Sequence, residues 1–372
     1  MKTAATETVE CNPDFPYIKG LEGIFLLNNN SNTGKGNGFD HSRYQYDPNK
    51  PLQVGGQAVI EGVMMRAPGR IATAVRRASG EIVVKVKNYT SLAEKNSFFK
   101  LPILRGAVGL VEMMFIGIET LNFSGEVAFR DLESANDGEE KKPAKKESTS
   151  NVKLALTVLF SLVVGIAVFF IMPLLVTTKL FNVEQNAFGF NIIAGLIRLS
   201  VLLVYLIGIS LLKDVKRLFE YHGAEHKAVF TFESKGELTV DSAKTFTRFH
   251  PRCGTSFILI VMLIAMILFS LLDSLMILWV GKLSLPIRLM THLPLIPIVG
   301  GVAYEFIRWS AKKSNTTIGK ILVAPGLWMQ RITTQEPDAS ELEVALVAIR
   351  CALGIENPIP YTEITHVSEL AA

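Results

Sequence analysis

Four long apolar segments constrain the fold of this chain more than any other feature of its sequence. They cover residues 154–176, 191–212, 255–280 and 283–304. A helix rises about 1.5 Å per residue, so about 20 residues cross a hydrocarbon core of about 30 Å, and each segment reaches that length. One such segment alone also fits a buried helix of a soluble protein, but four in succession indicate membrane spans. The sequence therefore predicts a mainly α fold, a polytopic membrane helix bundle of about four spans.

The connections that flank these segments are alternately rich and poor in lysine and arginine. The stretch before the first span, residues 213–252 and the tail after residue 304 are rich in both, whereas the other two connections contain only Lys179 and Lys282. Positive residues concentrate in cytoplasmic loops, so the alternation predicts that both termini and the 213–254 loop face the cytoplasm. The expected partner is therefore the lipid bilayer, and a protein partner or a homo-oligomer stays open.

Four ionisable residues interrupt the spans: Arg198, Asp273, Arg288 and His292. Such groups are costly inside a bilayer and are usually paired. One interpretation is an Arg198–Asp273 pair that braces two helices, and the other is a polar cavity for a substrate or a lipid headgroup. The fourth span also contains prolines, which predict a kinked or broken helix.

Composition divides the rest of the chain into regions. Alternating apolar residues on either side of Ser79 and Gly80 predict a β-hairpin, and the charged but apolar residues 101–122 predict a helix in the membrane interface. The expected organisation is a disordered extension at 1–50, a small cytoplasmic β-containing module with the interfacial helix at 51–130, a charged linker at 131–151, the four-span membrane domain with a His-rich cytoplasmic loop (213–254) at 152–330, and a cytoplasmic helix and tail at 331–372.

Two classes of protein are excluded by composition. The three cysteines are odd in number and widely spaced, so the chain is not a disulfide-stabilised scaffold. No basic stripe interleaved with aromatic residues is present, so nucleic-acid binding is not expected.

The sequence from His222 to His226 is the strongest candidate for a chemical site. On a helix, residues four apart share a face, so His222 and His226 can bind one metal ion. Glu225, beside the second histidine, can act as a general base toward a water molecule. The order H-x-x-E-H is that of the inverted zinc-peptidase motif. A polar helix end at the membrane surface, with histidines capping carbonyl groups, is the alternative.

His250 and Cys253 lie in the same loop and are separated by two residues, a spacing that is common for metal ligands. Imidazole and thiolate together suit zinc, so a divalent metal, zinc in the first place, is the expected cofactor. Four protein ligands would make a closed structural site, and three would leave one position for water, as catalysis requires. A reduced thiol in a simple turn is the alternative. Glu305 and Glu61 are the candidate additional carboxylates, although Glu61 can also pair with an arginine such as Arg66.

Several stretches resemble the signatures of a known family. They are residues 55–66 (GGQAVIEGVMMR), residues 221–227, residues 250–256 and residues 301–305 (GVAYE). This pattern resembles the YqhQ-like family, bacterial membrane proteins with a domain of unknown function that are labelled predicted metal-dependent enzymes. The resemblance covers about residues 54–353 and implies a location in the bacterial cytoplasmic membrane.

Two functions from different classes follow from these features. The first is a metal-dependent hydrolase that acts at the cytoplasmic membrane face, with Glu225 as base. The second is a non-catalytic membrane scaffold or assembly factor, with a structural metal site or none.

Overall fold

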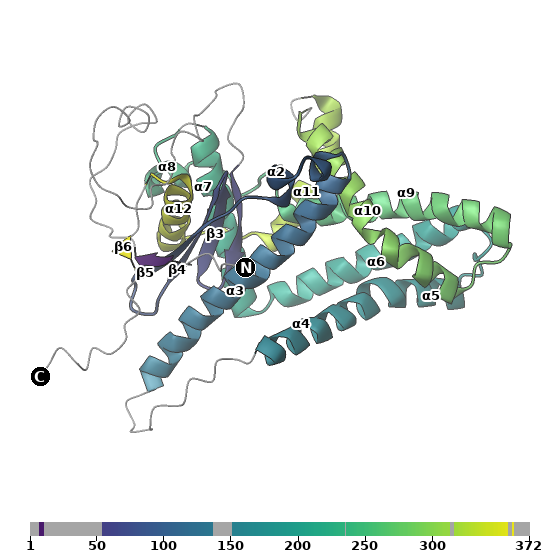
Figure 1. Cartoon of the computed structure of the whole chain (residues 1–372), viewed down its shortest axis with the longest axis horizontal. Coiled ribbons are helices and arrows are strands. Elements are labelled where there is room, and N and C mark those ends of the chain that lie inside the picture. The colour runs from purple at the N-terminus through teal and green to yellow at the C-terminus, as the bar shows by residue number, and fades with distance from the viewer. Residues whose placement is uncertain are drawn as a thin grey trace, which may run out of the picture.

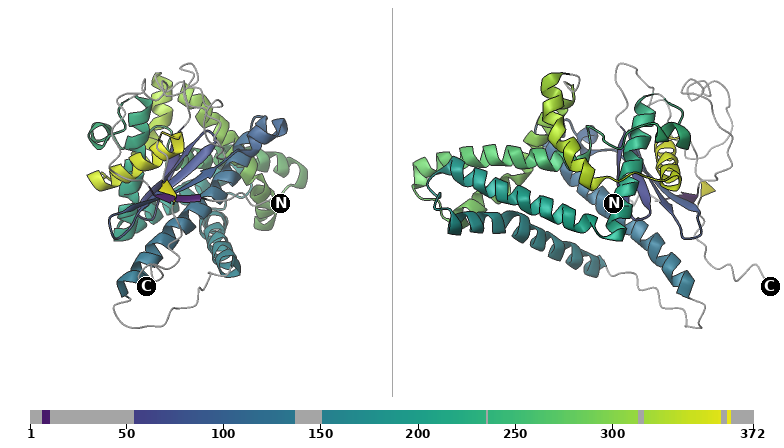
Figure 2. Two further views of the ribbon diagram at one scale, coloured as in Figure 1. Left: turned by 60° about the vertical axis from the view of Figure 1, so that its left-hand side comes forward. Right: turned by 180° about the vertical axis from the view of Figure 1, so that it is seen from behind.

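The computed structural model describes residues 7–10, 54–136, 151–234, 236–312, 316–355 and 359–360. The predicted disordered extension lies outside these residues except for a short strand, and so does most of the predicted charged linker. The described chain has two parts, a helix bundle and an α/β domain, and the bundle extends away from one side of the domain (Figures 1 and 2).

Four helical segments of the bundle are long and apolar enough to cross a membrane, which confirms the predicted number. These are Leu156–Leu180, Ala187–Ser210, Phe257–Val280 and Leu285–Ser310. The first comprises α4 (Asn151–Ile166), a π-helical turn (Ala167–Ile171) and α5 (Met172–Leu180), and the others lie in α6 (Ala187–Ser210), α9 (Gly254–Val280) and α10 (Leu285–Lys312). The fourth was expected to be kinked or broken. It is continuous, with Pro294 and Pro297 inside the helix.

Aromatic and aliphatic side chains fill the centre of the bundle. Phe170, Phe190 and Phe269 are buried together with Leu174 and Val299. Many other apolar side chains of the four segments are exposed, as expected of helices whose outer surface meets lipid rather than water.

The α/β domain is built on an antiparallel sheet. Its main strands are β2 (Gly55–Val59), β3 (Gly62–Ala67), β4 (Arg70–Arg76) and β5 (Ile82–Asn88). The predicted hairpin is β4–β5, and its turn contains Gly80 with a positive φ of 90°, a conformation that glycine adopts without strain. Two short strands from opposite ends of the chain, β1 (Glu7–Glu10) and β6 (Ile359–Pro360), extend the sheet beyond β5.

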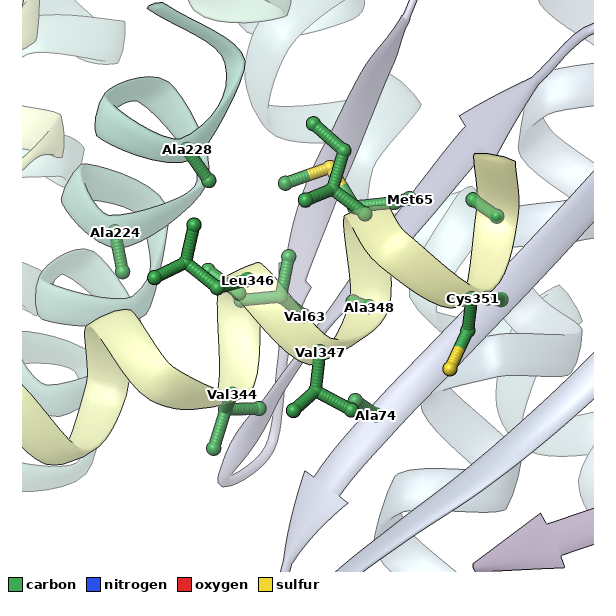
Figure 3. Packing of buried hydrophobic residues seen from close by; sticks show 14 of the residues in the cluster. Val63, Met65, Ala74, Ala224, Ala228, Val344, Leu346, Val347, Ala348 and Cys351 are labelled. Carbon is green, nitrogen blue, oxygen red and sulfur yellow. The ribbon is translucent and has the colours of Figure 1, made fainter. Parts of the chain in front are cut away.

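Helices cover both faces of the sheet, which is why β3 is apolar on both sides. On one face lie α7 (Lys213–Glu233) and α12 (Ala339–Leu353), which enclose Val63 and Met65. On the other face α3 (Leu104–Asn136) packs against Met64. Figure 3 shows Leu346 of α12 directed toward α7, and Val347 directed toward the sheet.

Three parts of the chain that were expected to be separate therefore share one core. The N-terminal strands, the first part of the 213–254 loop and the C-terminal helix pack together. In addition, α3 is a single helix that includes both the predicted interfacial segment and the first residues of the predicted linker. Its first turns pack on α10, where Gly106 lies against Tyr304, and this contact joins the domain to the bundle.

One further helix, α11 (Thr317–Thr333), follows α10 and is not among the four candidate spans. Its Met329 is buried against Leu202 of α6 and Leu259 of α9. Leu259 lies near the beginning of the third span, so α11 crosses the ends of the spans that are nearest the α/β domain.

Candidate metal centre

Two histidines and one cysteine meet where the α/β domain joins the bundle. His222 and His226 lie on one face of α7, with ring centroids 4.5 Å apart. Cys253 is the N-cap of α9, and its Sγ lies 3.2 Å from Nε2 of His222. The potential ligand atoms of these three residues all lie within 4.8 Å of one another. The structure thus brings together three of the four residues that the sequence indicated as metal ligands.

Backbone carbonyl groups orient both imidazole rings. Nδ1 of His222 lies 2.8 Å from the carbonyl oxygen of Thr333, and Nδ1 of His226 lies 2.5 Å from that of Arg248. A carbonyl oxygen only accepts hydrogen bonds, so Nδ1 of each ring donates to its carbonyl group, and Nε2 is the nitrogen that is left for a ligand. Metal-binding histidines in proteins are commonly held in this way.

The free nitrogen of His226 is the observation that fits a metal best. Its Nε2 is buried and makes no hydrogen bond within the described part of the chain. A buried nitrogen that lacks a partner costs free energy, and a metal ion would remove this cost. Two imidazole nitrogens and one cysteine thiolate form a donor set that suits zinc.

Glu225 lies at the edge of this cluster and is almost fully buried. Its Oε1 accepts a hydrogen bond of 2.8 Å from the backbone N–H of Gly56 in β2, and its Oε2 lies 3.5 Å from Nε2 of His226. Glycine is needed at position 56, because a Cβ atom there would lie 2.1 Å from the carbonyl oxygen of Met64 and 3.2 Å from Cγ of Glu225. Strand β2 therefore holds one carboxylate oxygen and leaves the other directed toward the histidines.

His250, the fourth residue of the predicted set, is next to this cluster but does not belong to it. Its ring is 5.6 Å from that of His226, but its Nδ1 accepts a hydrogen bond from the backbone N–H of Arg252 and its Nε2 lies 3.5 Å from Glu233. Burial lowers the pKa of His250, against a smaller opposing effect of the Glu225 charge. The main chain of His250 also exchanges two hydrogen bonds with the side chain of Gln330. His250 thus supports the turn that presents Cys253.

The two additional carboxylates lie elsewhere. Glu305 is held by the guanidinium of Arg105, with two oxygen–nitrogen distances of 2.6 and 2.5 Å. Glu61, in the turn between β2 and β3, pairs with Arg217 of α7 rather than with Arg66, and lies 3.4 Å from the hydroxyl of Tyr221. Neither belongs to the group of potential ligands.

The charges inside the spans form a different pair from the one expected. Asp273 bonds to Arg288 and lies 2.9 Å from Nε2 of His292, and it accepts a hydrogen bond of 2.7 Å from Asn191. Arg198 instead donates to the carbonyl oxygen of Phe169. The short connection between α9 and α10 places Arg288 close to Asp273, so the nearer arginine forms the pair.

Sequence reasoning missed the groups that hold the candidate ligands. The carbonyl groups of Thr333 and Arg248 have no signal in a sequence, because every residue has a carbonyl. Gly223 did carry a signal, since glycine weakens a helix. A Cβ atom at this position would lie 2.1 Å from the carbonyl oxygen of Gln335, so glycine allows the segment after α11 to approach α7.

These features define a polytopic membrane protein with an α/β domain and a candidate metal centre at their junction. The chain belongs to the family described as protein of unknown function (DUF1385), whose model matches residues 101–355. It is 32% identical over 316 residues to the uncharacterized protein YqhQ of Bacillus subtilis (strain 168), and the match covers 82% of this chain and 94% of that protein. These matches confirm the resemblance to the YqhQ-like family. No solved structure matches the chain.

Proposed function

We propose that this protein is a metal-dependent hydrolase embedded in the membrane, with zinc held by His222, His226 and Cys253. The observation that carries the proposal is the buried Nε2 of His226, which makes no hydrogen bond within the described part of the chain and lies beside the other two donors. Three protein ligands leave a fourth position open, which is typical of catalytic rather than structural zinc. A zinc ion in such a site supplies Lewis acidity for hydrolysis.

Glu225 is the proposed general base. Its Oε1 is occupied by the Gly56 N–H, and its Oε2 lies on the side of the histidines, so one oxygen is positioned while the other accepts a proton. Its burial excludes bulk water from this carboxylate, which strengthens electrostatic interactions at the site.

The proposed location of the site is the cytoplasmic face of the bacterial cytoplasmic membrane. The distribution of lysine and arginine supports this orientation. The short strands β1 and β6 come from opposite ends of the chain and pair with each other on the α/β domain. Both ends of the described chain therefore lie on the same side of the helix bundle as the candidate metal centre. An even number of spans is consistent with this arrangement.

A structural metal site in a non-catalytic scaffold is the second candidate function. The position of the cluster favours it, because Cys253 begins a span whereas both histidines belong to the α/β domain. A metal ion there would fasten the domain to the bundle.

Metal analysis of the purified full-length protein tests the metal site. We expect about one zinc per chain, loss of zinc in Cys253→Ser, and full retention in Cys351→Ser. Cys351 is the matched control, because it is also a buried cysteine but lies on α12, away from the two histidines. Equal zinc contents in the two variants would contradict the proposed ligand set.

Glu225→Gln distinguishes the two functions, because the amide has nearly the same shape as the carboxylate but cannot accept the proton. For a hydrolase, we expect this variant to keep its zinc and its thermal stability but to lose the ability to complement a deletion strain. If complementation remains intact in a zinc-loaded Glu225→Gln protein, the scaffold function is correct and the hydrolase is not.

A further inference from the structure

A pocket opens beside the candidate metal centre, between α9, α10 and α11. It has a volume of about 200 Å³ and includes Cys253 in its wall. Its apolar wall comes from two spans and from α11, and consists of Ile260, Ile307, Leu322 and Val323. Its polar wall consists mainly of Arg252 and Glu233, which form an ion pair with each other. The pocket is thus lined by apolar residues and by a charged pair, and a potential metal ligand, Cys253, also lines it.

Helix α11, which forms one wall, exposes three large apolar side chains on its outer face, while Met329 on its inner face is buried. Ile318, Ile321 and Trp328 are exposed, whereas the buried positions include Gly319 and Gln330. The exposed residues share one face at helical spacing, and two exposed basic residues, Lys320 and Arg331, lie near the two ends of the helix. This is the reverse of a helix that faces water, and it is typical of a helix that lies in the membrane interface, where tryptophan and basic residues are enriched.

The position of α11 agrees with that environment. Met329 packs on Leu202 and Leu259, close to the ends of two spans. The exposed face of α11 therefore lies next to the ends of the spans, and the pocket lies between that helix and the spans.

We propose that this pocket binds part of a membrane lipid, and that lipids of the adjacent leaflet are the substrate class. The inference rests on the proposed hydrolase function. In this arrangement the acyl or glycerol portion of the lipid contacts Ile307, Leu322 and Val323. The polar headgroup forms polar contacts with Arg252 and Glu233. Ligand pockets for whole drug-sized molecules measure about 300–1,000 Å³. A pocket of about 200 Å³ takes only one portion of the lipid, and the rest stays in the bilayer.

A soluble polar substrate fits these observations less well. Such a molecule would have to bury polar groups against the aliphatic wall, which is costly without hydrogen-bond partners. A lipid places its apolar portion there at no such cost and approaches along the surface that the spans and α11 share.

Photocrosslinking of the full-length protein in lipid nanodiscs tests this inference. The probe is a phosphatidylglycerol with a diazirine in its acyl chain, mixed into phosphatidylethanolamine, and crosslinked peptides are mapped by mass spectrometry. We expect labelling at Ile260, Ile307 or Leu322. Val323→Trp fills the pocket and should reduce this labelling at least fivefold. The matched control Ile321→Trp adds the same side chain to the exposed face of α11 and should leave it unchanged.

Labelling that is confined to the outward faces of the helices, or equal in the two tryptophan variants, would overturn the lipid pocket. Zinc content is measured on the same samples, which separates the two proposals. Zinc-loaded protein without pocket labelling overturns the lipid inference alone. Zinc-free wild-type protein that still labels in the pocket overturns the hydrolase and confirms that the pocket binds lipid.

Discussion

Replacing Gly223 by alanine tests the contact that positions the candidate metal centre. Helix propensity alone predicts that this change stabilises α7 by about 1 kcal/mol. The structure predicts the opposite, because the new Cβ atom would lie 2.1 Å from the carbonyl oxygen of Gln335 and 3.2 Å from Cδ of Pro337. The nearer atom belongs to the backbone and cannot turn away. The segment must move by more than 1 Å to reach an ordinary contact of about 3.5 Å, and overpacking of this kind costs about 1–3 kcal/mol.

The displaced segment also carries a group that orients the cluster. The carbonyl oxygen of Thr333 bonds to His222, and the N–H of Gln335 bonds to the carbonyl oxygen of Phe219. We therefore expect Gly223→Ala to lower both the unfolding temperature of the detergent-solubilised protein and its zinc content. The unfolding temperature is measured by intrinsic tryptophan fluorescence.

Gly109→Ala is the matched control for this experiment. Gly109 lies in α3, where an added Cβ atom meets nothing within 4 Å among the described residues outside the neighbouring backbone of its own helix. That variant should have an unchanged or slightly higher unfolding temperature and normal zinc. The reasoning is refuted if Gly223→Ala is as stable as Gly109→Ala and binds as much zinc.

Three further predictions concern the spans, the α/β domain and the topology. Asp273→Leu leaves Arg288 buried without its partner, at a cost of about 3–5 kcal/mol. The double change with Arg288→Leu should restore part of the lost protein level in membranes, and additive losses would show that the two residues are not coupled. Burial raises the pKa of Glu341 to about 7 from 4.5, so the native state binds a proton there between these pH values and the unfolded state does not. Stability should therefore rise as pH falls from 7 toward 4.5. Glu341→Gln should remove this dependence and add at most about 3 kcal/mol above pH 7, and an unchanged pH profile in thermal unfolding would contradict it. For the topology, a cysteine at Gln185 should react with an impermeant thiol reagent in intact cells and one at Glu237 should not, whereas equal labelling would reject the proposed orientation.

The features that the sequence predicted well are those that depend on local patterns. Span length and the four-residue spacing of His222 and His226 follow from helix geometry, so the number of spans and the shared face of the two histidines could be anticipated. Cys253 was included because of its spacing from His250, yet in the structure it joins the other two histidines and His250 does not.

The features that were not predicted depend on contacts between distant parts of the chain. The hydrophobic pattern of α12 shows that one face is buried, but it contains no information on the strands that cover it. The partner of Asp273 was equally undetermined, since Arg198 and Arg288 both lie in spans and only the packing of α9 against α10 selects Arg288. Glu305 illustrates the same limit, because its partner Arg105 is 200 residues away.

The most direct test of the account is zinc-edge X-ray absorption on the full-length protein purified without chelators. The account predicts about one zinc per chain, with one sulfur ligand at about 2.3 Å and two imidazole nitrogens at about 2.0–2.1 Å. The sulfur contribution should disappear in Cys253→Ser and persist in Cys351→Ser. A metal-free wild-type protein, or bound zinc whose spectrum contains no sulfur ligand, would contradict the proposed centre.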